Sequence, residues 1–118
     1  MQYLLIIYSD ETIWAPDTRT DPAVLQEISA SHMRLAAEMQ EKGAMVGGNR
    51  LKPTETATTV RTQGGVQSLH DGPYAETREQ LAGYYLVEAP DLDAAIGWAK
   101  KIPGGPNYAV EVRPIHTM

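Results

Sequence analysis

Residues 84–115, YYLVEAPDLDAAIGWAKKIPGGPNYAVEVRPI, decide the fold that the sequence predicts. The opening YYLVEA is short, apolar and rich in residues that favour strands. Pro90 and Asp91 then open a helix in which apolar residues recur at helical spacing. Pro103 and the glycines after it stop this helix, and YAVEVRPI predicts a closing strand. The segment therefore predicts a strand, a helix and a second strand in succession.

The N-terminal part of the chain shows the same alternation. The apolar stretch Tyr3–Tyr8 predicts a strand that is buried on both faces. Asp21 and Pro22 predict a helix start, because aspartate caps free N–H groups and proline suits the first helical position. This helix is predicted from about Pro22 to Lys42, with Gly43 as its C-cap. The following AMVGGNRLKP predicts a short strand, and its glycine pair indicates a bulge or a close backbone approach.

Between these two units the sequence predicts a hairpin and a short helical turn. TATTVRTQ is β-branched and alternating, GG at 64–65 fits a hairpin turn, and VQSLH returns from it. AETREQLAG, residues 75–83, is helix-prone and predicts about two helical turns ending at Gly83. The complete order is that of a split βαβ arrangement. We therefore expect one domain over residues 1–118, an α+β ferredoxin-like sandwich with an antiparallel sheet and helices on one face.

The strand patterns predict that the other face of the sheet is bare. Tyr84, Leu86 and Glu88 share one side of their strand, and Tyr85 and Val87 share the opposite side. Each strand thus has a mainly aliphatic side for the helices and a side that mixes aromatic and charged groups. An exposed sheet face with several tyrosines is a candidate dimer surface or ligand wall.

Composition and charge exclude several classes of function. The chain has 118 residues, which suits one domain, and no cysteine, which excludes disulfides and thiolate chemistry. Its net charge is −5 and its lysines and arginines are scattered, so we expect no nucleic-acid partner. The longest apolar run, LLIIY, is too short to span a bilayer, and the N-terminus has no secretory pattern. We expect a cytoplasmic protein with no membrane partner.

Three stretches of the chain resemble a known family. DGPYAETREQLAGYYLVE at 71–88, YLLIIYSDE at 3–11 and AVEVRPI at 109–115 together resemble the YciI-related superfamily, in its DGPF branch. The likeness covers essentially the whole chain. Tyr74 replaces the usual phenylalanine, Ala82 stands where glycine is common, and His70 occupies a position that is often threonine or valine.

The resemblance implies a homodimer in which two ferredoxin-like sheets pack face to face around a cleft, as a dimeric α+β barrel. Relatives in the wider superfamily suggest a His–Asp acid–base pair, and one relative removes halide from a chlorinated hydroquinone. Other DGPF proteins are associated with extracytoplasmic-function sigma factors. The resemblance therefore implies either an enzyme or a regulatory module.

The candidate catalytic residues are Asp71, His32 and His70. Asp71 would act as a general base or orienting carboxylate at the cleft mouth, or it caps the turn before Gly-Pro. His70 is a proton-transfer candidate, but adjacent strand residues point to opposite faces, so it does not easily pair with Asp71. His32 lies on the apolar stripe of the first predicted helix, and either bonds a carbonyl in the core or faces the cleft.

The candidate residues for binding a small-molecule ligand are Tyr8, Trp14, Tyr74, Tyr84 and Arg78. Tyr8, Tyr74, Tyr84 and Tyr85 would provide flat apolar walls with hydroxyl tips, although core or dimer packing is the favoured role for at least two of these four. Trp14 would act as a lid over the cleft. Arg78 would pair with an anionic ligand or with its acidic neighbours in the chain. No two histidines lie at ligand spacing on one element, so we expect no metal site.

Two functions remain open on the sequence alone. No glycine-rich nucleotide loop, phosphate loop or Gly-x-Ser-x-Gly elbow occurs, which argues against hydride transfer, phosphoryl transfer and serine hydrolysis. The first function is acid–base catalysis without a cofactor on a small molecule, aromatic or otherwise, in a dimeric cleft. The alternative is a non-catalytic module that binds a small ligand and signals to another protein.

Overall fold

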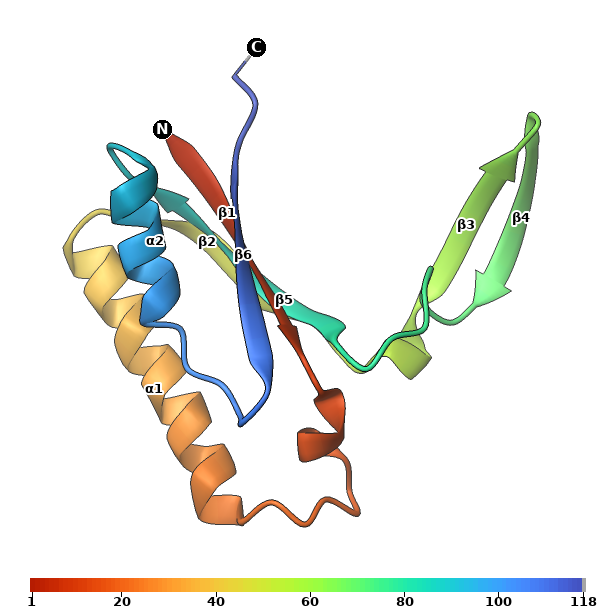
Figure 1. Ribbon diagram of the computed structural model, residues 1–118, viewed down its shortest axis with the longest axis horizontal. Coiled ribbons are helices and arrows are strands. Elements are labelled where there is room, and N and C mark those ends of the chain that lie inside the picture. The colour runs from red at the N-terminus through yellow and green to blue at the C-terminus, as the bar shows by residue number, and fades with distance from the viewer. Residues whose placement is uncertain (118) are drawn as a thin grey trace.

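The computed structural model describes residues 1–117 and confirms the α+β fold (Figure 1). One antiparallel sheet of four strands has the order β2-β5-β1-β6, which is the ferredoxin-like order. Its strands are β1 (Gln2–Ser9), β2 (Met45–Arg50), β5 (Gln80–Glu88) and β6 (Tyr108–Pro114). The helices are α1 (Pro22–Glu41) and α2 (Leu92–Lys100), and the short 3-10 helices are η1 (Glu11–Trp14) and η2 (Thr54–Thr56).

Both helices begin where the sequence predicts. The Asp21 carboxylate accepts a hydrogen bond from the Ala23 N–H at 2.9 Å, ahead of α1. The Asp91 carboxylate accepts from the Ala94 N–H at 2.8 Å, ahead of α2. Each bond satisfies one of the N–H groups that a helix start leaves unpaired. Within residues 1–117, neither helix has the length and apolarity needed to cross a membrane.

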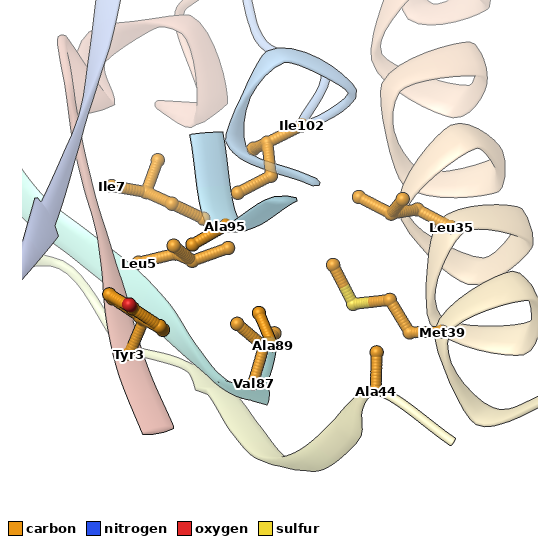
Figure 2. Packing of buried hydrophobic residues seen from close by; sticks show 10 residues of the cluster. All are labelled: Tyr3, Leu5, Ile7, Leu35, Met39, Ala44, Val87, Ala89, Ala95 and Ile102. Carbon is orange, nitrogen blue, oxygen red and sulfur yellow. The ribbon is translucent and has the colours of Figure 1, made fainter. Parts of the chain in front are cut away.

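The core lies between the two helices and one face of the sheet (Figure 2). Leu5 and Val87 of the sheet are fully buried and face Met39 of α1 and Ala95 of α2. The alternation of a strand gives β1 one buried side, and its other side, Leu4, Ile6 and Tyr8, is only half-buried. The predicted burial of β1 on both faces is therefore wrong for the single chain, because no described part of it covers the second face.

The hairpin is confirmed, and it leaves the body of the molecule. Strands β3 (Thr58–Gln63) and β4 (Val66–Asp71) pair only with each other, as a separate two-stranded sheet that projects to one side (Figure 1). Gly64 and Gly65 have φ values of +58° and +78°, which only glycine adopts without strain in this turn. The predicted bulge in β2 is confirmed by a register shift between Met45 and Gly47.

The predicted helical turn at residues 75–83 is wrong. Residues 73–79 are irregular, and β5 begins at Gln80 and runs through Gly83. Gln80 pairs with Ser9 of β1, so pairing with the sheet prevails over local helix preference. Gly83 does not end a helix. It permits close approach of β2, since a Cβ here would lie 2.6 Å from the Asn49 carbonyl oxygen.

Candidate functional site

A cavity of about 620 Å³ opens on the helix side of the sheet, and we call it the helix-side cavity. It lies between α1, η1, the end of the sheet and the segment that leads into β6. Its volume is within the range of small-molecule sites. Most of its wall is apolar or aromatic, including Ile7, Ile13, Trp14, Ile28 and Tyr108. The polar groups within this apolar wall therefore determine which ligands the cavity can bind.

Local hydrogen bonds hold the η1 side of the cavity in place. The Asp10 carboxylate caps η1 by accepting from the Thr12 N–H at 3.0 Å and from the Thr12 hydroxyl at 2.6 Å. The Glu11 carboxylate accepts from the Thr54 N–H at 3.0 Å and from its hydroxyl at 2.5 Å. Glu11 thereby ties the segment after β1 to the segment after β2. Trp14, at the end of η1, is positioned as part of the wall.

His32 of α1 and Tyr85 of β5 form a hydrogen-bonded pair at the cavity wall. The His32 Nδ1 lies 2.8 Å from the Tyr85 hydroxyl, and their rings are stacked with centroids 6.0 Å apart. Both side chains are half-buried. The pair forms because His32 lies on the apolar stripe of α1 and Tyr85 lies on the helix-facing side of β5. Two polar groups on facing apolar surfaces satisfy each other.

Burial keeps this pair neutral near pH 7. Burial lowers the pKa of His32 below its ordinary value of 6.5; a backbone hydrogen bond with Pro103 opposes this, and the positive charge of Arg50 lowers the pKa further. Proline has no N–H, so this effect of Pro103 comes from its carbonyl oxygen. For the neutral imidazole we assign the Nε2–H tautomer, in which Nδ1 accepts the hydroxyl proton of Tyr85. Burial also raises the pKa of Tyr85, which disfavours a free phenolate.

We expect His32 to make stability depend on pH. Folded His32 binds a proton less readily than unfolded His32, so its contribution is complete above the ordinary pKa of 6.5 and is lost as pH falls toward the lowered folded pKa. His32→Gln should remove this part of the pH dependence of the free energy of unfolding. Urea denaturation at about pH 7.5 and about pH 5 measures it, since ordinary histidine titrates between these values. His70→Gln, at an exposed position, should keep the wild-type dependence, and equal behaviour of the two variants would contradict the assignment.

Arg50 supplies positive charge at the same cavity. Its guanidinium carbon lies 4.3 Å from the centroid of the Trp14 ring, as a cation–π contact. Among the ion pairs within residues 1–117, none involves Arg50. Lys52 also lines the cavity, as do Glu55 and Glu11, whose carboxylate is already bonded to Thr54. An aromatic wall, an arginine without a carboxylate partner and a neutral His–Tyr pair together suit a small organic anion.

Comparison with known proteins places the chain in a family. The model of the YCII-related domain matches residues 1–118.

The chain belongs to the YCII-related family.

It is also 34% identical over 122 residues to an uncharacterized protein of Rhizobium meliloti (strain 1021), with 98% of this chain and 92% of that protein covered. The resemblance to the family is thus confirmed, and the DGPF branch stays a prediction.

In this YCII-related chain, Asp71 lies away from the helix-side cavity. It lines a second cavity of about 380 Å³ at the base of the hairpin, together with Glu55, Glu76 and Gln80. Within residues 1–117, no hydrogen bond or ion pair joins the Asp71 carboxylate to an imidazole. His70 is exposed on β4, and alternation along the strand directs it to the face opposite Asp71. One chain therefore does not bring these predicted partners together.

The predicted ligand-binding residues are divided between several places. Trp14 and Tyr84 both line the helix-side cavity, but strand alternation directs the Tyr84 side chain to the uncovered sheet face. There the Tyr84 hydroxyl accepts a hydrogen bond from Asn49 at 2.9 Å. Tyr8 is half-buried on the uncovered sheet face. Tyr74 is exposed, with the Arg61 guanidinium 5.6 Å from its ring centroid. Arg78 is exposed in the segment before β5. The position of Trp14 therefore supports contact with a ligand in the helix-side cavity best.

Arg50 was not among the predicted site residues, and Tyr85 was predicted only as one of four tyrosines that could line a ligand site, not as the partner of His32. A signal for Tyr85 was present, because strand alternation turns it toward the helices and His32 lies on the facing helix stripe. Two polar groups on surfaces that pack together must be partners or be left unsatisfied. Arg50 carried no such signal. Arg50 ends β2 opposite Gly83 of β5, but its contact with Trp14 depends on the conformation of η1, which has no periodic pattern in the sequence.

Proposed function

We propose that the chain binds a small, partly aromatic anion in the helix-side cavity and catalyses proton transfer on it without a cofactor. The observation that carries this proposal is the His32–Tyr85 hydrogen bond at the wall of a cavity that also holds Arg50. A neutral imidazole that is already bonded to a hydroxyl is ready to accept that hydroxyl's proton. Arg50 favours the negative charge of the bound molecule.

The proposed step moves one proton along two bonds. Tyr85 takes a proton from the bound molecule while its own hydroxyl proton passes to Nδ1 of His32. The products are a bound molecule with one more negative charge than before, a neutral tyrosine and an imidazolium. The two transfers occur together, because the buried Tyr85 disfavours a free phenolate. The return transfer completes an isomerisation or protonates a leaving group.

We further propose that two copies associate through the uncovered sheet face. Leu4, Ile6, Tyr84 and Leu86 leave a half-exposed apolar row on this face. A contiguous surface of this kind favours association with a matching surface. The dimeric α+β barrel belongs to this proposal, as does the cytoplasmic location that the sequence favours. A catalytic role for Asp71 at the second cavity is the alternative to the His32–Tyr85 pair.

The second candidate is a ligand-binding module without catalysis, acting in sigma-factor signalling as the DGPF resemblance implies. The observation that favours it is that Nδ1 of His32 is already hydrogen-bonded within the protein, to the Tyr85 hydroxyl. A histidine held in this way also serves as a fixed structural element. Binding of the same ligands with no chemical change in any of them would favour this candidate.

Binding of matched ligands tests the proposed recognition of an anion. We expect small aromatic carboxylates to bind and Arg50→Gln to weaken them by about tenfold, the value of a hydrogen bond to a charged group. The corresponding neutral amides should bind both proteins equally. Isothermal titration calorimetry measures both series.

Arg78→Gln is the matched control, since Arg78 is exposed and does not border the helix-side cavity. It should bind the carboxylates as the wild type does. If Arg50→Gln and Arg78→Gln weaken binding equally, the effect comes from long-range electrostatic attraction and not from a specific anion site. If neither does, the proposed anion site is wrong.

A further inference from the structure

The β3–β4 hairpin projects from the body of the molecule as an arm. We define the arm as residues 58–71. Every arm residue except Thr59 is exposed, and the arm stands apart from the body of the chain (Figure 1). A two-stranded hairpin alone is at best marginally stable in water. The sequence nevertheless specifies it strongly, with a β-branched strand and the Gly64–Gly65 turn.

One face of the arm is apolar at its centre. Val60 and Leu69 are direct cross-strand partners and are 59% and 77% exposed. Their neighbours on this face are the pairs Thr58–Asp71 and Thr62–Gln67. The other face carries Arg61 and His70, with Val66 at its end. The Val60–Leu69 pair is therefore the natural contact point.

The solvent-accessible surface area of the chain indicates how much area is available for an interface. A compact monomer of 12.9 kDa exposes about 6,300 Å². This chain exposes 8456 Å², an excess of about 2,100 Å² over the compact value. Its radius of gyration is 16.1 Å, whereas about 13.5 Å is typical of a compact domain of this length. A standard interface buries about 800 Å² on each partner, so the excess suits a large, permanent interface.

We infer that the Val60–Leu69 face of each arm packs on the body of a second copy of this chain, so that two arms clasp reciprocally. The inference rests on the dimer proposed above and adds the arm to its interface. A second copy is the occupant because the same chain carries both an unsupported arm and an uncovered sheet face. In a dimer with twofold symmetry, each copy then covers the arm and the sheet face of the other.

Sedimentation velocity over a range of concentrations tests this inference. Leu69→Glu should weaken self-association by about tenfold or more, because a charge would enter an apolar contact. Val66→Glu, at an equally exposed position on the other face, should leave the dimer dissociation constant within about threefold of the wild-type value. A wild-type chain that stays monomeric throughout would overturn both the dimer and the arm contact.

Leu86→Glu distinguishes the two parts of the interface. If it disrupts the dimer while Leu69→Glu does not, the sheet-face dimer stands and the arm inference is wrong. Hydrogen exchange gives an independent readout that does not depend on variants. Arm amides should exchange slowly in the dimer and rapidly after dilution to monomer. Slow exchange in the monomer would show a self-sufficient arm and would contradict the inference.

Discussion

Replacement of His32 by glutamine should slow turnover of a substrate found by screening by about 10²- to 10⁴-fold, the usual contribution of general acid–base catalysis. Glutamine can still hydrogen-bond to Tyr85 but cannot accept its proton. The dissociation constant of the substrate should change by no more than about threefold, because binding depends on Arg50 and the aromatic wall. Steady-state kinetics and calorimetry on the same variant measure the two effects.

Tyr85→Phe should cause a similar loss, since it removes the other half of the relay. The double variant should be little slower than either single variant, because the two residues act as one unit. Asp71→Asn should retain turnover within about tenfold, as expected for a residue outside the reacting pair. A large loss with Asp71→Asn and none with His32→Gln would place the chemistry at the second cavity instead.

Leu5→Ala should lower the free energy of unfolding by about 2–5 kcal/mol, the range for a leucine removed from a packed core. Leu5 is fully buried and lies among residues from both helices and the sheet (Figure 2). Such a loss is a large share of the stability of an ordinary domain. Urea denaturation followed by circular dichroism measures it.

Leu4→Ala is the matched control, one residue away on the same strand. Leu4 is only half-buried on the uncovered face, so its removal should cost less than about 1.5 kcal/mol in the monomer. Equal losses for the two variants would mean that β1 is buried on both sides. That result would contradict the orientation of the sheet.

Much of the fold was predictable from the sequence because local signals and packing agree. Asp21 and Asp91 start the helices, Gly64 and Gly65 form the turn, and alternation sets the faces of the strands. The error at residues 75–83 has a physical cause. The helix-prone composition of these residues predicted helical turns, but pairing of Gln80 with β1 makes residues 80–83 the start of β5 instead.

The candidate site was less predictable because a cavity depends on loop positions. His32 and Trp14 were identified from residue type and position in the chain. The pairing of Tyr85 with His32 needed the additional step of asking which polar groups meet across packed faces. The contact of Arg50 with Trp14 depends on the conformation of η1, which hydrogen bonds of Thr54 to the Glu11 carboxylate fix from a distant part of the chain. Such contacts leave no periodic pattern to read.

The most direct test of the helix-side site is to map a bound aromatic carboxylate by NMR chemical-shift changes. The account predicts the largest changes at Trp14, His32 and Tyr85, with small changes at Asp71 and at Leu86. Changes confined to Leu86 and its neighbours on the uncovered sheet face, or to the surroundings of Asp71, would contradict it. In that case the helix-side cavity would not be the binding site.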